Sequence, residues 1–108
     1  MSIGEWWRRR RAKKRADAQM ARASNEAGIT ARVDMVRLEA LAEAAYDAMY
    51  EARLHGARDR YEEARMHFEA AIEAANRARL YEEAGRLKRR RDHIARVYNS
   101  QFRYSGEN

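Results

Sequence analysis

The sequence lacks cysteine and proline altogether and contains only five glycines among 108 residues. Without cysteine the chain can form neither a disulfide framework nor a thiolate metal site. A sheet protein needs a turn about every 8–12 residues, and glycine and proline usually mark such turns. Their scarcity predicts an all-helical protein, and the length suits one domain rather than a large multi-step enzyme.

Large aliphatic side chains are also scarce, since Leu, Ile, Val and Phe together supply 14 residues. This is too few for a large aliphatic core. The 22 alanines must fill most of the interior, with six tyrosines and five methionines as larger anchors. We therefore expect helices that approach closely, and a thin core that a protein partner or self-association completes.

Extended apolar stretches are missing as well. No window of 18 apolar residues exists, so no transmembrane helix is predicted. The first residues lack the apolar stretch of a secretory signal and the serine-rich composition of a transit peptide. A cytoplasmic protein is the expectation.

Charge is plentiful but unevenly distributed. Residues 1–32 carry nine Lys or Arg against three acids, a net charge of +6. Residues 33–75 carry a net −5, and residues 76–108 a net +5. The middle segment is therefore expected to pair with the C-terminal segment in a folded hairpin, while the N-terminal third carries the net charge of the whole chain.

A basic helix is predicted at the N-terminus. Ser2 and Glu5 match the capping box of a helix start, and the helix is expected over residues 3–23. Its expected end is a cluster of weak helix formers: Ser24, Asn25 and Gly28. The chain thus divides into a basic N-terminal helical arm and loop, residues 1–29, and a helical body, residues 30–108.

Seven of eight consecutive residues in the arm are cationic: Arg8, Arg9, Arg10, Arg11, Lys13, Lys14 and Arg15. A helix that is charged on all sides repels itself, so a polyanion is expected to bind and order it. Nucleic acid fits through arginine–phosphate contacts. An anionic membrane surface also fits, with Trp6 and Trp7 as anchors at the headgroup level. A third interpretation is a solvated basic tail, with both tryptophans packed against the body.

Three helices are predicted in the body, over residues 30–54, 57–78 and 80–102. Thr30 is expected to cap the first of them, and Gly56 to end it. No strong breaker separates the last two, so one long kinked helix is an alternative. Each helix carries apolar residues at spacings of three and four, the pattern of one buried face. These stripes are Leu38, Leu41, Ala45, Ala48, Met49 and Ala52; Ala57, Tyr61, Ala64, Phe68, Ala71, Ile72 and Ala75; and Leu80, Ala84, Leu87, Ile94, Val97, Tyr98 and Phe102.

One group of residues resembles the second half of a tetratricopeptide repeat: Tyr61, Glu62, Glu63, Ala64, Phe68 and Ala71. The resemblance extends over residues 46–98. It lacks the Trp and the Leu-Gly pair of the preceding helix, and Asn76 stands near the place where proline is usual. It implies a TPR-like helical hairpin that binds other proteins. Since fewer than three repeats seldom fold alone, it also implies a cap or self-association.

A second basic cluster lies in the predicted last helix, with Arg86, Arg89 and Arg90 on one outer face. These side chains could bind phosphate groups through charge-assisted hydrogen bonds. They are also suited to pair with the acidic helix over 57–78 through four glutamates: Glu62, Glu63, Glu69 and Glu73. We favour the pairing, because the −5 and +5 segments are consecutive and expected to be antiparallel.

The sequence shows no catalytic or metal constellation. Glu63 and His67 lie one helical turn apart and would share a face with His93, but the Glu-x-x-His spacing of di-iron bundles is absent. There is no Gly-rich phosphate loop and no nucleophile elbow. We therefore predict a protein that is not an enzyme, with no cofactor, no metal and no small-molecule substrate.

Together these features predict a non-catalytic helical adaptor or assembly protein. Its body would bind a protein partner, and its arm would hold a polyanion, first of all nucleic acid in a larger particle. A peripheral membrane-surface adaptor that uses Trp6 and Trp7 is one alternative. A helical enzyme with an unrecognised site is the other.

Overall fold

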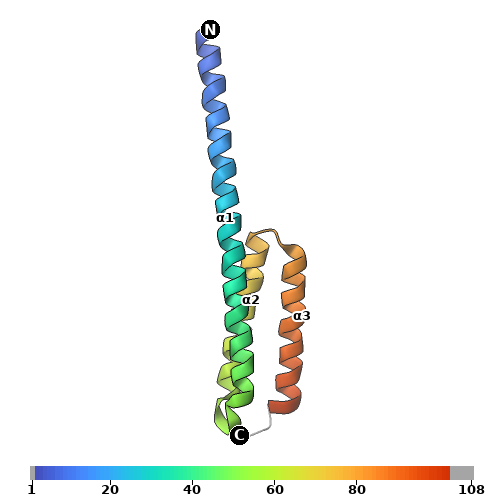
Figure 1. The fold of residues 1–108 in the computed structure, drawn as a ribbon. Coiled ribbons are helices and arrows are strands. Elements are labelled where there is room, and N and C mark those ends of the chain that lie inside the picture. Colours follow the sequence, from blue (N-terminus) through green and yellow to red (C-terminus); the bar gives the residue numbers. More distant parts are fainter. Residues whose placement is uncertain (1, 103–108) are drawn as a thin grey trace.

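The computed structural model describes residues 2–102, apart from the side chains of residues 53–55. Within that range the chain is all-helical and contains no strand, which confirms the predicted class (Figure 1). The elements are α1 (Ile3–Glu51), α2 (Arg53–Arg77), α3 (Tyr81–Val97) and a π-helical turn, η1 (Tyr98–Phe102).

The first helix, α1, runs without interruption through the segment where a loop was predicted. Ser2 does cap it, because its Oγ accepts a hydrogen bond of 3.2 Å from the backbone N–H of Glu5. The predicted break at residues 24–28 is wrong, and so is Thr30 as a cap, since Thr30 lies inside the helix. A single glycine costs a helix only about 1 kcal/mol relative to alanine, and Gly28 is flanked by Ala27 on one side and by Ile29 on the other. Without proline, nothing in the segment stops the helix.

Because α1 is continuous, its N-terminal half extends away from the rest of the molecule. At 1.5 Å per residue, its 49 residues make a rod of about 74 Å, in a molecule that measures 80 × 18 × 17 Å. Figure 1 shows α2 and α3 beside the C-terminal half of α1 only. Residues 2–27 are all exposed, and Ala31 is the first buried residue. We call residues 2–27 the projecting segment; it takes the place of the predicted arm and loop.

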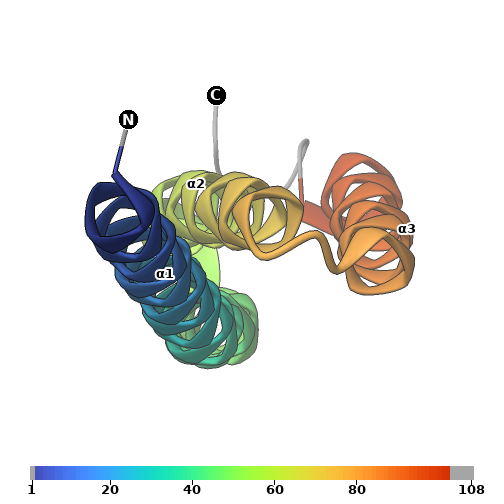
Figure 2. The same cartoon turned by 90° about the horizontal axis from the view of Figure 1, so that it is seen from above.

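The body is a narrow arrangement in which α2 lies between α1 and α3 (Figure 2). The buried face of α1 has alternating spacings of four and three residues, the repeat of helices packed at a shallow angle. It consists of Ala31, Met35, Ala42, Ala45 and Met49, with Leu38 half-buried among them. Leu41 was expected on this face but is 42% exposed. Its neighbour Ala42 occupies the contact position, about 100° further round the helix.

The apolar stripes predicted for the last two helices are confirmed. In α2, Ala64, Phe68 and Ala71 are fully buried, and in α3 Leu87 and Ile94 are buried. Buried alanines with these spacings suit any closely packed helix pair, so the resemblance to a tetratricopeptide repeat stays a prediction.

The last part of the chain forms two separate helices, α2 and α3, rather than one long kinked helix. Arg79 has a φ of 58°, the left-handed conformation that glycine usually adopts at a helix C-terminus. The N–H of Leu80 donates to the carbonyl of Ala75 at 2.8 Å, and that of Arg79 to Asn76 at 3.0 Å. This is the hydrogen-bond pattern of a Schellman motif, and it ends α2 although no glycine or proline marks the place.

Gly56 does not end a helix, as had been predicted, because α1 ends at Glu51 and Gly56 lies inside α2. The reason for glycine here is space. A Cβ placed on Gly56 would lie 2.8 Å from the Cβ of Ala52, which is shorter than real carbon contacts allow. By contrast, a Cβ on Gly28 would meet nothing within 4 Å.

The two glycines therefore predict opposite effects of the same substitution. Gly56→Ala is expected to lower the free energy of unfolding by about 1–3 kcal/mol, because the added methyl group displaces Ala52 at the junction of α1 and α2. Gly28→Ala, directly after the projecting segment, is expected to increase the helicity of the chain, because alanine favours a helix over glycine by about 1 kcal/mol. Circular dichroism with urea and heat measures both. Unchanged stability of the first variant, or reduced helicity of the second, would contradict the structure.

Candidate polyanion-binding site

The seven cations predicted as a polyanion site all lie, exposed, on the projecting segment: Arg8, Arg9, Arg10, Arg11, Lys13, Lys14 and Arg15. Successive side chains are about 100° apart on a helix, so these charges surround the rod. Within residues 2–102, none of them forms an ion pair; Arg8 donates to the carbonyl of Gly4 at 3.2 Å instead. No described carboxylate therefore neutralises these charges at ion-pair distance.

Trp6 and Trp7 lie at the tip of the rod and contact each other. They are 45% and 48% exposed, and their ring centroids lie 4.8 Å apart in an edge-to-face arrangement. The guanidinium carbon of Arg10 lies 5.2 Å from the centroid of Trp6 and 6.0 Å from that of Trp7. Neither ring packs on the body, because the helix carries Trp6 about 48 Å along its axis from Leu38. The interpretation of these rings as part of the core is therefore wrong.

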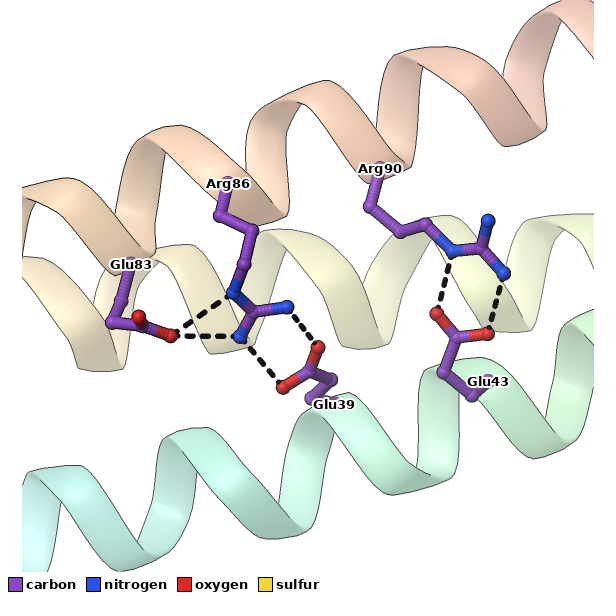
Figure 3. A network of polar contacts seen from close by, with 5 residues as sticks. All are labelled: Glu39, Glu43, Glu83, Arg86 and Arg90. Carbon is purple, nitrogen blue, oxygen red and sulfur yellow. Dashed lines mark hydrogen bonds and ion pairs between the residues drawn. The ribbon is translucent and has the colours of Figure 1, made fainter.

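Two arginines of the second basic cluster, Arg86 and Arg90, form ion pairs with α1, whereas Arg89 does not. Arg86 donates to both carboxylate oxygens of Glu39, at 2.6 and 2.9 Å, and to Glu83 at 2.8 Å. Arg90 donates to both oxygens of Glu43, at 2.7 and 2.9 Å. Figure 3 shows the two arginines reaching from α3 to α1, one helical turn apart. Both guanidinium groups are thus paired with carboxylates of the same chain.

Arg86 and Arg90 do form ion pairs with glutamates, as expected, but these glutamates belong to α1 and not to the helix over 57–78. The glutamates of α2 form their ion pairs with arginines of α2 itself: Arg60–Glu63, Arg65–Glu62, Arg65–Glu69 and Arg77–Glu73. Arg89 is exposed and has no ion pair in the described part of the chain. Glu39 and Glu43 were missed, although their spacing of four matches that of Arg86 and Arg90.

These contacts shift the pKa values of the groups that form them. The hydrogen bond from Arg86 lowers the pKa of Glu39, and the two hydrogen bonds to Glu39 and Glu83 raise the pKa of Arg86. The guanidinium of Arg90 also lies 5.1 Å from the ring centroid of Tyr46. Burial raises the pKa of Tyr46 to about 12, and its hydrogen bond with Tyr50 adds to that shift. Both arginines thus stay charged and belong to the fold.

The described side chains include no group of three or more His, Asp or Glu residues that could hold a metal ion. An open groove borders the α2–α3 turn, and no pattern in the sequence predicts it. It is lined by Arg32, Met35, Val36, Arg79, Leu80, Tyr81, Glu82 and Glu83. Its apolar members, Met35, Val36, Leu80 and Tyr81, come from α1, the α2–α3 turn and the start of α3.

No helix in the described range combines the length and the apolar character that crossing a bilayer requires. Comparison with protein-family models, with curated proteins and with solved structures found no match for the chain. Evidence for its function therefore comes from its own residues.

The ion pair between Glu43 and Arg90 predicts a measurable coupling between α1 and α3. Glu43→Gln and Arg90→Gln are each expected to destabilise the body, and the double variant by less than their sum. A coupling energy of about 0.2–1 kcal/mol is typical of such partly exposed pairs. A double-mutant cycle by urea unfolding measures it, and 1 M salt is expected to reduce it. A coupling of zero at low salt would show that the pair does not form in solution.

Glu39 predicts how stability depends on pH. Its pKa is lower in the folded chain than the ordinary 4.5, so its contribution to stability is present above about pH 4.5. As the pH falls through the folded pKa, protonation breaks the contact with Arg86, and the free energy of unfolding drops. In the Glu39→Gln variant, the free energy of unfolding is expected to fall less on acidification than in the wild type. Glu26→Gln, on the projecting segment, serves as a control and is expected to leave the loss unchanged.

Proposed function

We propose that this protein is a non-catalytic adaptor that holds nucleic acid on its projecting segment and binds a protein partner through its body. The observation that carries the proposal is the contrast between two sets of arginines. Arg86 and Arg90 are matched by carboxylates of α1, whereas the seven cations of the projecting segment have no carboxylate partner among the described residues. Such a surplus of exposed charge suits a polyanion.

The shape of the projecting segment supports nucleic acid as that polyanion. A single helix about 10–12 Å across fits the major groove of DNA, which is about 12 Å wide. Helices that extend from a folded or dimeric body with a basic stretch along them bind DNA in this way. Cations on all sides of the rod can also contact phosphates on both sides of a groove.

The body supplies the second half of the proposal. Its resemblance to a tetratricopeptide repeat implies protein binding, and the groove at the α2–α3 turn combines apolar side chains with charged ones of both signs. Ile29, Val33 and Val36 are each more than half exposed where α1 leaves the body. Burial of these side chains by a partner would supplement a core built mostly of alanine.

A membrane-surface role is the second candidate, and one observation favours it. Trp6 and Trp7 are exposed beside the cations, as in segments that anchor at lipid headgroups. Against it, the residues from Arg8 to Arg15 leave no continuous apolar face to enter the bilayer, whereas an interfacial helix needs one.

Two triple variants with equal changes in charge test the proposal. Arg9, Arg11 and Arg15 are replaced by Gln on the projecting segment, or Lys88, Arg89 and Arg96 on the outer side of α3. The first is expected to weaken binding to a DNA duplex and to reduce the slope of log affinity against log salt by about 0.9 per lost phosphate contact. The second is expected to change it little.

Fluorescence anisotropy of a labelled duplex between 50 and 200 mM salt, the conditions over which such contacts lose affinity most, measures both slopes. A variant with all seven cations replaced by Gln is expected to lose binding while its body unfolds at the wild-type temperature. Binding that is independent of salt, or equal losses in the two triple variants, would reject the proposed site.

A further inference from the structure

The only two tryptophans of the chain form one exposed aromatic unit at the tip of the rod. No other element covers them, since α2 and α3 lie beside the opposite end of α1 (Figure 1). Nearly half of each residue remains accessible even though the rings contact each other. Exposed indole of this extent is costly in water, and a ligand that covers it gains affinity.

Cations follow this pair along the same side of the helix. Arg10 lies four residues after Trp6 and three after Trp7, the spacings that place side chains on one face. Its guanidinium group lies over both rings, at 5.2 and 6.0 Å. Lys13 and Lys14 follow at the same spacing. The stretch from Trp6 to Lys14 rises about 12 Å, roughly the length of three to four stacked nucleotides.

Aromatic rings beside a row of cations recognise a particular form of nucleic acid. Indole faces stack on nucleobases of any sequence, while the cations follow the phosphates. Bases within a duplex are already stacked on their neighbours, so only unpaired bases offer a free face. Arg10 lies over part of these rings, so a stacking base would replace its guanidinium group there and leave that group free to contact a phosphate.

We infer that Trp6 and Trp7 form a stacking site for unpaired bases, so that the projecting segment binds single-stranded nucleic acid more tightly than duplex. This inference rests on the proposed function and adds a discrimination that charge alone does not provide. Arg10, Lys13 and Lys14 hold the phosphates next to the stacked bases.

The natural fluorescence of the full-length protein provides the first test, because both indoles lie in the site. An unlabelled oligodeoxythymidine strand is expected to quench the tryptophan emission, since its bases stack on the rings. Inorganic polyphosphate of similar charge is expected to bind without comparable quenching, because it has no bases. A duplex is expected to lie between the two.

The second test removes the rings and keeps the charge. The double variant Trp6→Ala and Trp7→Ala is expected to bind a labelled oligodeoxythymidine at least about 10-fold more weakly, and polyphosphate with unchanged affinity. Met20→Ala, also exposed on the projecting segment, is the matched control and is expected to change neither. Circular dichroism is expected to show full helicity in all variants, because alanine favours a helix and these side chains lie outside the core.

The outcomes separate the inference from the function beneath it. If the double variant loses the single strand and polyphosphate equally, or neither, while binding stays salt-dependent, the stacking site is refuted and the polyanion site stands. If no nucleic acid binds at low salt, both are refuted. A blue shift of tryptophan emission on vesicles with phosphatidylserine, without quenching by the oligonucleotide, would refute both in favour of a membrane role.

Discussion

Close approach of helices through alanine is the constraint on which the body depends. Ala64, Ala71, Ala74 and Ala75 are fully buried in α2, so this helix can lie against α1 and α3 at once in a molecule only 17–18 Å across. A few larger side chains fill the space that remains: Phe68, Met49, Leu87 and Ile94. Their number is small, so interactions at the edge of the core matter more than in a protein rich in leucine. The two arginine–glutamate contacts that join α3 to α1 are of this kind.

Arginine has two different roles here, and its neighbours decide between them. In the body, Arg86 and Arg90 lie opposite carboxylates that are spaced, like them, by one helical turn (Figure 3). In the projecting segment no second helix runs alongside, so the arginines there form no ion pair with a described carboxylate, and Arg10 lies over an aromatic ring instead. Residues 1–32 carry a net charge of +6, as large as that of the whole chain. This separation is the reason for proposing that the tip binds a ligand, while the arginines of α3 stabilise the fold.

Because α1 is continuous, the position of the tip relative to the body is fixed, which matters for the proposed adaptor. A loop near residue 28 would let a basic arm swing freely or fold back on the acidic middle of the chain. An uninterrupted helix instead holds the tip about 40 Å from the body. Ligands at the two ends would be held at a set distance and orientation, as a component of a larger particle requires. The same rigidity keeps the cations away from Asp34 and the other acids of the body, which would otherwise compete with a polyanion.

Residue order alone specified much of this molecule. Composition indicated helices, three- and four-residue spacings indicated the buried faces of α2 and α3, and simple counting located the excess charge, because each is a property of neighbours along the chain. The course of α1 through Gly28 differs from the predicted loop, because weak helix formers lower the stability of a helix without ending it. Other features required the packed chain. Arg86 meets Glu39, and Arg90 meets Glu43, in each case across 47 positions of the chain. Such contacts depend on which helix lies beside which, and that follows from how whole faces fit together rather than from any local signal.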